Sequence, residues 1–188
     1  TYKTYHERLN NTLKAINRDY VDAYLIHFPS NYFKSHEKSE KLCELMEELK
    51  QSGKATTVGL SNFMANDISS LGKRAESFSI NQVPYNILQR EYEGKTRDLC
   101  QKAGIGYMAY SPTAQGLLAG RLSDKARNFP ARQWNKLYQE PLLTRSKPLR
   151  EKINSIAMDL KTKPIAVALA WVLEQKNIIT AIVGSHKA

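Results

Sequence analysis

At 188 residues, the chain has the length of one ordinary domain or slightly more and can bury a substantial core. Its 41% hydrophobic and 24% charged residues are typical of a soluble globular protein. No apolar run approaches the ~20 residues of a membrane helix, and the N-terminus TYKTYHERLN lacks the apolar segment of a secretory signal. We therefore expect a single domain over residues 1–188, located in the cytoplasm and without a membrane partner.

The charge is strongly basic and unevenly distributed. Lys and Arg number 28 against 18 acidic residues, giving +10, and residues 121–152 hold nine basic against three acidic residues, or +6 of that total. This stretch is either a solvated, irregular loop or a loop that closes over an anionic ligand. Basic motifs interleaved with aromatic residues are missing, so we expect no nucleic-acid partner.

Strands and helices are predicted to alternate along the chain. Helical periodicity occurs at 4–17, 39–53, 64–76, 93–103, 147–160 and 164–176. Short β-branched or aromatic runs predict strands at 21–29, 56–63, 78–86, 105–112 and 179–185. Because parallel neighbours need long crossovers, this alternation predicts an α/β fold with a parallel sheet.

Polar residues gather at the C-terminal end of every predicted strand, which is where ligands bind in parallel α/β folds. They are His27, Ser61 with Asn62, Asn81 with Gln82, Tyr110 with Ser111, and Gly184 with Ser185. Each has an alternative interpretation. His27 is either a hydrogen-bonded core residue or a functional one, and Ser61 and Asn62 either cap a helix or bind a ligand.

The amides and two glycine-containing turns indicate the kind of ligand. Asn81 and Gln82 need hydrogen-bond partners if buried, and together with Ser61 and Asn62 they suit a planar carboxamide. The turn AYSPTAQGLLAGR (109–121) exposes backbone N–H groups that favour phosphate. IVGSHKA (182–188) adds the cationic donors His186 and Lys187. Cys43 and Cys100 are far apart without metal-ligand spacing, so we expect reduced thiols and no metal site.

Ordered motifs along nearly the whole chain resemble the aldo-keto reductase superfamily, in the branch of bacterial stress-type reductases and potassium-channel β subunits. They are DYVDAYLIHFP, GKATTVGLSNF, INQVPYNILQRE, GIGYMAYSPTAQGLLAGRL, RNFPARQW, ALAWVLEQKNI and AIVGS. The resemblance implies a (β/α)8 TIM barrel of which this chain supplies about strands 4 to 8. It also implies NADP(H) as cofactor and reduction of small-molecule aldehydes or ketones by hydride transfer.

The resemblance assigns roles to individual residues. His27 is the active-site histidine that orients the substrate carbonyl, and Tyr110 stacks on the nicotinamide ring. The carboxamide is held by Ser61, Asn62 and Gln82; the pyrophosphate is lined by Ser111, Pro112, Gln115, Gly116 and Leu117; and the adenosine ribose and its 2′-phosphate meet Gly184, Ser185, His186 and Lys187.

Three departures from the family pattern are visible. Thr113 stands where Leu is usual, Val183 replaces a common Pro, and His186 stands where an Arg often contacts the 2′-phosphate. The family's proton-donating Tyr, with its Lys and Asp, belongs to strands and loops before the first motif. We therefore expect these 188 residues alone to be inactive. The alternative function is a non-catalytic, NADP(H)-binding regulatory protein similar to a channel β subunit.

Overall fold

The computed structural model describes residues 2–29, 35–120, 122 and 130–184. The chain divides into two compact units, and the boundary between them passes through two strands. The first unit comprises residues 1–83 and 92–107, and the second comprises residues 84–91 and 108–188. The single-domain assignment for residues 1–188 stays a prediction.

In the first unit, helices and strands alternate. The helices are α1 (Tyr2–Ile16), α2 (His36–Gln51), α3 (Ala65–Leu71), the 3-10 helix η2 (Gly72–Ser77) and α4 (Lys95–Lys102). The strands are β1 (Val21–Ile26), β2 (Ala55–Ser61), β3 (Ile80–Pro84) and β4 (Gly106–Tyr110). Pro84 and residues 108–110 of the last two strands belong to the second unit. β1 and β2 pair in parallel, as do β2 and β3.

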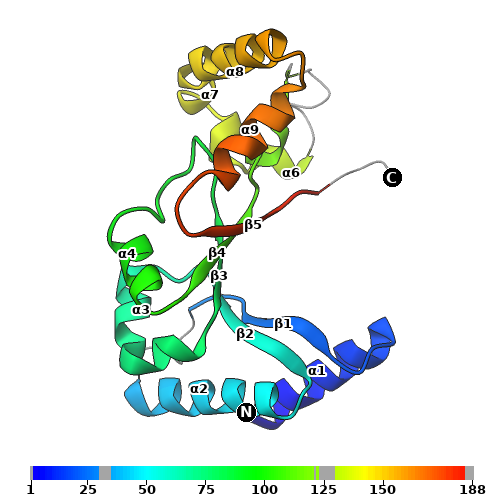
Figure 1. Ribbon diagram of the computed structural model, residues 1–188, viewed down its shortest axis with the longest axis vertical. Coiled ribbons are helices and arrows are strands. Elements are labelled where there is room, and N and C mark those ends of the chain that lie inside the picture. Colours follow the sequence, from blue (N-terminus) through cyan, green and yellow to red (C-terminus); the bar gives the residue numbers. More distant parts are fainter. Residues whose placement is uncertain (1, 30–34, 121, 123–129, 185–188) are drawn as a thin grey trace. The chain divides into compact units, whose positions relative to one another are not determined.

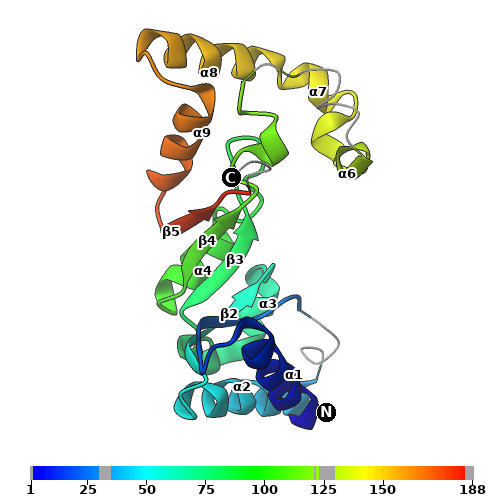
Figure 2. The same ribbon diagram turned by 90° about the vertical axis from the view of Figure 1, so that its right-hand side faces the viewer.

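Local signals explain where the second helix ends and how it packs. Gly53, at φ 73°, takes the left-handed conformation that commonly ends a helix, and its N–H donates to the Lys50 carbonyl. Leu42, Leu45 and Leu49 are buried along one face of α2. Figures 1 and 2 show α1 and α2 side by side on the same face of β1 and β2.

The second unit is mostly helical. It contains the end of β4, the 3-10 helix η3 (Ala114–Gly116), α6 (Pro130–Gln133), the 3-10 helix η4 (Lys136–Tyr138), α7 (Leu142–Arg145), α8 (Lys147–Asp159), α9 (Pro164–Leu173) and β5 (Ile178–Ile182). A proline lies in the first turn of both α8 and α9, where its missing N–H costs nothing. α9 packs against α8 and β5 (Figure 1).

The predicted elements have counterparts at nearly the predicted positions. The strands form a five-stranded sheet in the order β1-β2-β3-β4-β5. A parallel α/β architecture is therefore confirmed. Among the described residues, no helix has both the length and the apolar character required to cross a membrane.

Of the two interpretations of residues 121–152, the solvated, irregular loop was wrong for the part that the structure describes, and closure over an anionic ligand stays a prediction. Residues 130–152 form α6, η4, α7 and the start of α8. Leu137, Tyr138 and Leu143 are buried in a hydrophobic cluster with Leu117 and Ile153. These apolar side chains fold the segment into short helices, because burying them excludes a solvated loop. Residues 121 and 123–129 lie outside the described residues.

Candidate functional site

Four of the predicted site residues lie in the first unit, at adjoining ends of neighbouring parallel strands. His27 directly follows β1, Ser61 ends β2, Asn62 comes next, and Gln82 lies near the end of β3. The register pairs Ile26 with Leu60 and Ser61 with Gln82, which brings these strand ends together. We call these four residues, His27, Ser61, Asn62 and Gln82, the first cluster.

Asn62 links the members of the first cluster. Its Nδ2 donates to the His27 carbonyl at 3.0 Å and to the Ser61 Oγ at 3.0 Å, while its backbone N–H donates to the Gln82 carbonyl at 2.9 Å. Asn62 has φ 65°, a conformation that asparagine tolerates better than most residues. Ser61 Oγ donates to the same Gln82 carbonyl at 3.0 Å. One residue, through its side chain and its backbone N–H, therefore connects the ends of three strands.

The capping alternative for Ser61 and Asn62 is not what the structure shows. Helix α3 begins at Ala65, and the backbone N–H of Met64 donates to the Asp67 carboxylate at 2.9 Å. Ala65 N–H is bound by Thr96 Oγ1 at 3.1 Å. These two N–H groups are therefore satisfied by Asp67 and Thr96 and not by Ser61 or Asn62.

Asn81, by contrast, has a structural role. Its side chain is fully buried; Nδ2 donates to the Phe63 carbonyl at 2.8 Å, and Oδ1 accepts from the Phe63 N–H at 3.3 Å. A reciprocal pair of this kind satisfies both ends of the buried amide. Asn81 therefore fixes the segment that follows β2, whereas Gln82 on the neighbouring position is only half-buried.

His27 itself is exposed, and its ring lies 4.4 Å from the ring of Phe28, centroid to centroid. Its backbone carbonyl accepts a hydrogen bond from Asn62. The core-residue interpretation of His27 is therefore wrong for this structure. The functional role of His27 stays a prediction.

The remaining described site residues lie in the second unit, at the end of β4, in the turn that follows it, and beyond β5. Tyr110 is half-buried at the end of β4, its carbonyl accepts from the Tyr85 N–H at 3.1 Å, and burial raises the pKa of its hydroxyl. The turn comprises Ser111, Pro112, Thr113, Ala114, Gln115, Gly116 and Leu117, and we call these residues the β4 turn. Gly184 is exposed two residues beyond β5, and Ser185, His186 and Lys187 lie outside the described residues.

Three residues that the sequence analysis did not select as site residues hold the ends of the β4 turn. Asn86 is fully buried, and its Nδ2 donates to the Ser111 carbonyl at 3.0 Å. At the other end, Arg132 Nε and the Tyr138 hydroxyl both donate to the Gln115 carbonyl at 3.0 Å. Asn86 occurs in the quoted motif INQVPYNILQRE and Arg132 in RNFPARQW, but nothing in the sequence indicates that they contact this turn.

Thr113, which departs from the family pattern, contributes its hydroxyl to the turn. Thr113 Oγ1 accepts from the Gly116 N–H at 3.2 Å, and the Thr113 carbonyl accepts from the same N–H at 3.0 Å. A leucine there would supply only the carbonyl.

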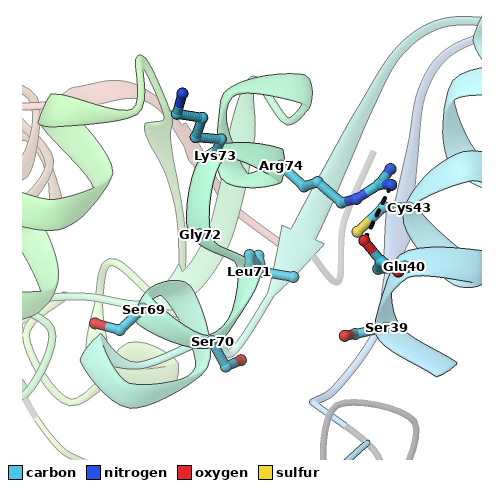
Figure 3. A pocket seen from close by; sticks show the side chains of 9 residues that line it. All are labelled: Ser39, Glu40, Cys43, Ser69, Ser70, Leu71, Gly72, Lys73 and Arg74. Atoms are coloured by element: carbon cyan, nitrogen blue, oxygen red, sulfur yellow. Dashed lines mark hydrogen bonds and ion pairs between the residues drawn. The ribbon is translucent and has the colours of Figure 1, made fainter. Parts of the chain in front are cut away.

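A separate cavity of about 320 Å³ lies in the first unit, between α2 and the α3–η2 segment. Figure 3 shows Arg74 reaching across it towards Glu40, with Cys43 behind. Cys43 is buried, and desolvation raises the pKa of its thiol to about 11, so a thiolate does not form near neutral pH. None of the predicted site residues lines this cavity.

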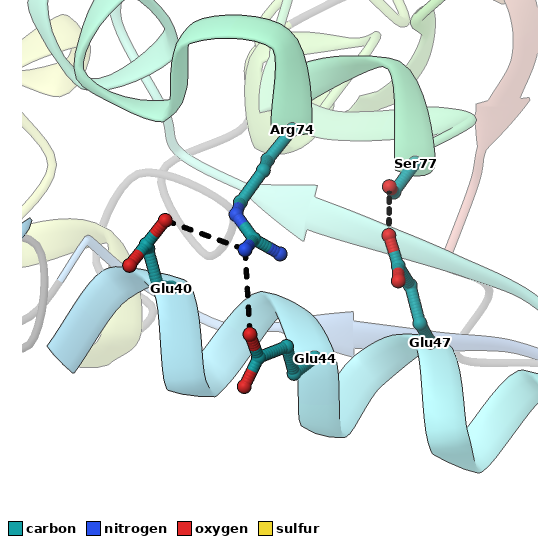
Figure 4. A network of polar contacts seen from close by, with 5 residues as sticks. All are labelled: Glu40, Glu44, Glu47, Arg74 and Ser77. Atoms are coloured by element: carbon teal, nitrogen blue, oxygen red, sulfur yellow. Dashed lines mark hydrogen bonds and ion pairs between the residues drawn. The ribbon is translucent and has the colours of Figure 1, made fainter. Parts of the chain in front are cut away.

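Ion pairs across this cavity tie η2 to α2. Arg74 Nη2 lies 3.3 Å from a carboxylate oxygen of both Glu40 and Glu44, and Ser77 Oγ donates to the Glu47 carboxylate (Figure 4). Because these ion pairs are partly exposed, they contribute little to stability. Among the described residues, no group of three or more His, Cys, Asp or Glu side chains is arranged to bind a metal ion.

Comparison with known proteins identifies relatives along the whole chain. Aldo-keto reductase YhdN of Bacillus subtilis is 28% identical over 96% of the chain, and the NADH-specific methylglyoxal reductase of Escherichia coli is 28% identical over 95%. Each alignment covers 54% of the relative. The chain thus spans about half the length of the curated relatives it matches.

Solved structures are likewise similar to nearly the whole chain, and the match covers about half of each of them. A glycerol dehydrogenase from Gluconobacter oxydans superposes with a TM-score of 0.77 at 22% identity, over 96% of this chain and 54% of that one. An aldo-keto reductase from Klebsiella pneumoniae, solved in complex with NADPH, superposes with a TM-score of 0.69 at 25% identity, over 95% and 54%. These structures are aldo-keto reductase TIM barrels.

The family match extends over the whole sequence. The sequence model described as "Aldo/keto reductase family" matches residues 1–188. It includes both the first cluster and the β4 turn. This chain therefore belongs to the aldo/keto reductase family.

Proposed function

We propose that this protein is an NADP(H)-dependent oxidoreductase that reduces small-molecule aldehydes or ketones to alcohols, and that residues 1–188 supply strands 4 to 8 of its barrel. Family membership supports the reaction class, and the NADPH complex of the Klebsiella pneumoniae structure supports the cofactor. The observation that carries the proposal is the first cluster, in which Asn62 joins an exposed histidine to Ser61 and Gln82.

The chemistry of the first cluster fits a nicotinamide carboxamide. Ser61, Asn62 and Gln82 bring one hydroxyl and two amides to adjoining strand ends, and a planar carboxamide needs both donors and acceptors. We assign the carboxamide to these three residues. NADP(H), when bound, supplies the hydride that reduces the carbonyl carbon.

The second unit offers an aromatic ring and a turn for the rest of the cofactor. Tyr110 has a half-buried ring suited to stacking on the nicotinamide. We assign the pyrophosphate to Ser111, Pro112, Gln115, Gly116 and Leu117, because this turn follows a strand end and its glycine allows close backbone approach. The ribose and 2′-phosphate are assigned to Gly184, Ser185, His186 and Lys187.

His27 orients the substrate carbonyl in this proposal. Its imidazole is exposed at the C-terminal end of β1, and its backbone is fixed by Asn62. An imidazole N–H in this position can donate to a carbonyl oxygen and so hold the carbonyl carbon in line for reduction. Because Asn62 belongs to the cofactor-binding group, the same side chain couples the position of His27 to that of the cofactor.

The protein is further proposed to act in the cytoplasm. Cys43 and Cys100 are both free and buried, as is usual in a reducing compartment.

The test uses the whole protein as its gene encodes it, with methylglyoxal as carbonyl substrate and loss of NADPH absorbance as the signal. His27→Gln is expected to lower kcat/KM by roughly 10²-fold, the loss typical of a misplaced reacting group. His6→Gln is the matched control, because His6 lies in α1 and pairs with Glu48 at 3.8 Å, away from the first cluster. A His27 variant as active as the His6 variant would contradict the role of His27.

The cofactor assignment is measured separately by titrating NADPH and NADH against protein fluorescence. NADPH is expected to bind more tightly, because Lys187 and the basic residues of 121–152 favour an additional phosphate. Tighter binding of NADH, the cofactor named for the Escherichia coli relative, would reverse this assignment, and binding of neither would contradict the proposed function.

A further inference from the structure

The β4 turn has an unusual backbone that must be held in place by its surroundings. φ is positive at Ser111 (52°), Ala114 (51°), Gln115 (55°) and Gly116 (95°). For residues with a Cβ, the left-handed conformation costs on the order of 1–2 kcal/mol each. Three such residues within five positions persist only where neighbouring groups over-determine the conformation.

The peptide unit between Gln115 and Gly116 is held at both ends. Its carbonyl oxygen accepts two hydrogen bonds at 3.0 Å, from Arg132 Nε and from the Tyr138 hydroxyl. Its N–H donates to Thr113, to the carbonyl at 3.0 Å and to Oγ1 at 3.2 Å. Because a peptide unit is planar, fixing both groups fixes the orientation of the whole unit.

The two donors come from the segment that follows the turn, and they also contact each other. Arg132 belongs to α6 and Tyr138 to η4. The guanidinium carbon of Arg132 lies 5.5 Å from the centroid of the Tyr138 ring, within the range of a cation–π contact. We call these two residues the Gln115 clamp.

The Gln115 clamp is rigid because Tyr138 is anchored in the core. Tyr138 is buried in the same hydrophobic cluster as Leu117 and Leu118, which directly follow the clamped peptide. Burial raises the pKa of its hydroxyl, although Arg132 and Arg150 partly oppose this change, so the hydroxyl is a proton donor at neutral pH.

Gly116 fits beside Arg132 because it has no side chain. A Cβ at Gly116 would lie 3.1 Å from Nη2 of Arg132, and the φ of 95° is one that residues with side chains rarely adopt. The glycine thus lets the guanidinium rest directly on the turn, and the turn and the clamp fit each other.

We propose that Arg132 and Tyr138 are positioning residues that pre-organise the β4 turn for the cofactor by fixing the Gln115 carbonyl. This inference rests on the proposed function, in which the turn lines the pyrophosphate of NADP(H). Without the clamp, the Gln115–Gly116 peptide samples other orientations, and binding must then order it at a cost in affinity. The clamp therefore sets the affinity for the cofactor and leaves the chemistry at His27 unchanged.

The test compares variants of the whole encoded protein by NADPH titration and steady-state kinetics. Tyr138→Phe keeps the ring and removes one donor to Gln115. It is expected to raise both the Kd and the KM for NADPH about 5- to 10-fold, with kcat at saturating NADPH unchanged. Arg132→Lys keeps the positive charge and removes the Nε donor, and it is expected to raise the same two constants to a similar extent.

Tyr107→Phe is the matched control. The Tyr107 hydroxyl is also buried and donates to a backbone carbonyl, that of Tyr92 at 2.8 Å, in the other unit. This variant is expected to lower the thermal unfolding temperature and leave the Kd for NADPH unchanged. Equal effects of Tyr107→Phe and Tyr138→Phe on the Kd would show a general structural role and overturn the inference.

Two further outcomes separate the inference from the proposed function. If the natural protein binds NADPH and the Tyr138→Phe and Arg132→Lys variants bind it equally well, the positioning role is wrong and the proposed function stands. If the natural protein does not bind NADPH, the proposed function fails and this inference fails with it.

Discussion

Gly59 shows how one residue fixes the approach of neighbouring strands. It lies in β2 opposite both Leu25 of β1 and Ile80 of β3. A Cβ there would lie 2.5 Å from Leu25 Cδ2 and 2.9 Å from both Cβ and the carbonyl oxygen of Ile80. The flexible end of Leu25 can move aside, but the Ile80 backbone is part of the sheet.

Gly59→Ala is therefore expected to lower the free energy of unfolding by roughly 1–3 kcal/mol, the usual cost of overpacking a core. Chemical denaturation measures this change. Thr56→Ala, at an exposed position of the same strand, is the control and is expected to change the free energy by less than about 0.5 kcal/mol. Equal effects of the two substitutions would mean that the strands can separate to admit the methyl group.

Tyr107 gives a prediction for alkaline pH. Its side chain is fully buried, and desolvation, with smaller contributions from Cys100 and Tyr92, raises the pKa of its hydroxyl above 10.0, although Arg97 opposes the shift. In the unfolded chain the hydroxyl titrates near 10, so above that pH the folded state holds a proton that the unfolded state has lost. Stability from Tyr107 is present below pH ~10 and is lost as the pH rises towards its folded pKa.

The free energy of unfolding is thus expected to fall progressively above pH ~10. Tyr107→Phe removes one titrating group and is expected to make this fall less steep. Denaturation curves recorded at several alkaline pH values measure both slopes. Identical slopes for the two proteins would show that Tyr107 does not contribute to alkaline unfolding.

Among elements, the connection between β3 and α4 supports the β4 turn. Its central residue is Asn86, whose Nδ2 donates to Gln89 Oε1 at 2.8 Å and to the Ser111 carbonyl at 3.0 Å. Its Oδ1 accepts from the N–H groups of Leu88 and Gln89, both at 3.0 Å. One buried amide therefore shapes its own loop and holds the start of the next.

Asn86→Ala is expected to lower the free energy of unfolding by roughly 1–3 kcal/mol, because it leaves buried polar groups without partners. Asn66→Ala, an exposed change on α3, is the control and is expected to be nearly neutral. Thermal unfolding of both variants measures this change in stability. An Asn86 variant as stable as the natural protein would show that water replaces the lost hydrogen bonds.

The basic stretch shows what element prediction from sequence missed. Charge dominates residues 121–152, and hydrophobic periodicity is too short there to indicate helices before residue 147. In the structure, Leu137, Tyr138 and Leu143 are buried against Leu117 and Ile153. The partners that bury these side chains are distant in sequence, so the short helices α6, η4 and α7 follow from tertiary contacts rather than from local pattern.

For the whole molecule, the relevant fact is that the chain spans about half the length of its relatives. In the family pattern that the sequence resembles, the proton donor and its partners come before the motifs found in residues 1–188. The 188 residues by themselves are therefore expected to show no reduction of methylglyoxal by NADPH. Turnover by the purified segment, verified by intact mass, would show that a residue within it supplies the proton.

The sequence alone determined the alternation of strands and helices, the parallel α/β class and the polar residues at the strand ends. Those features follow from hydrophobic periodicity and from residue chemistry, which are local properties. The order of its motifs also indicated the aldo-keto reductase family. Within the candidate site, the residue types of the first cluster and of the β4 turn were predictable for the same reason.

Only the tertiary structure decided how these residues are held. It separated Asn81, a buried structural amide, from Asn62, which joins three strand ends. It also brought Arg132 and Tyr138 onto the Gln115 carbonyl across 17 and 23 residues of sequence. Hydrogen bonds between distant residues leave no periodic trace in a sequence, because their geometry exists only after the chain has folded.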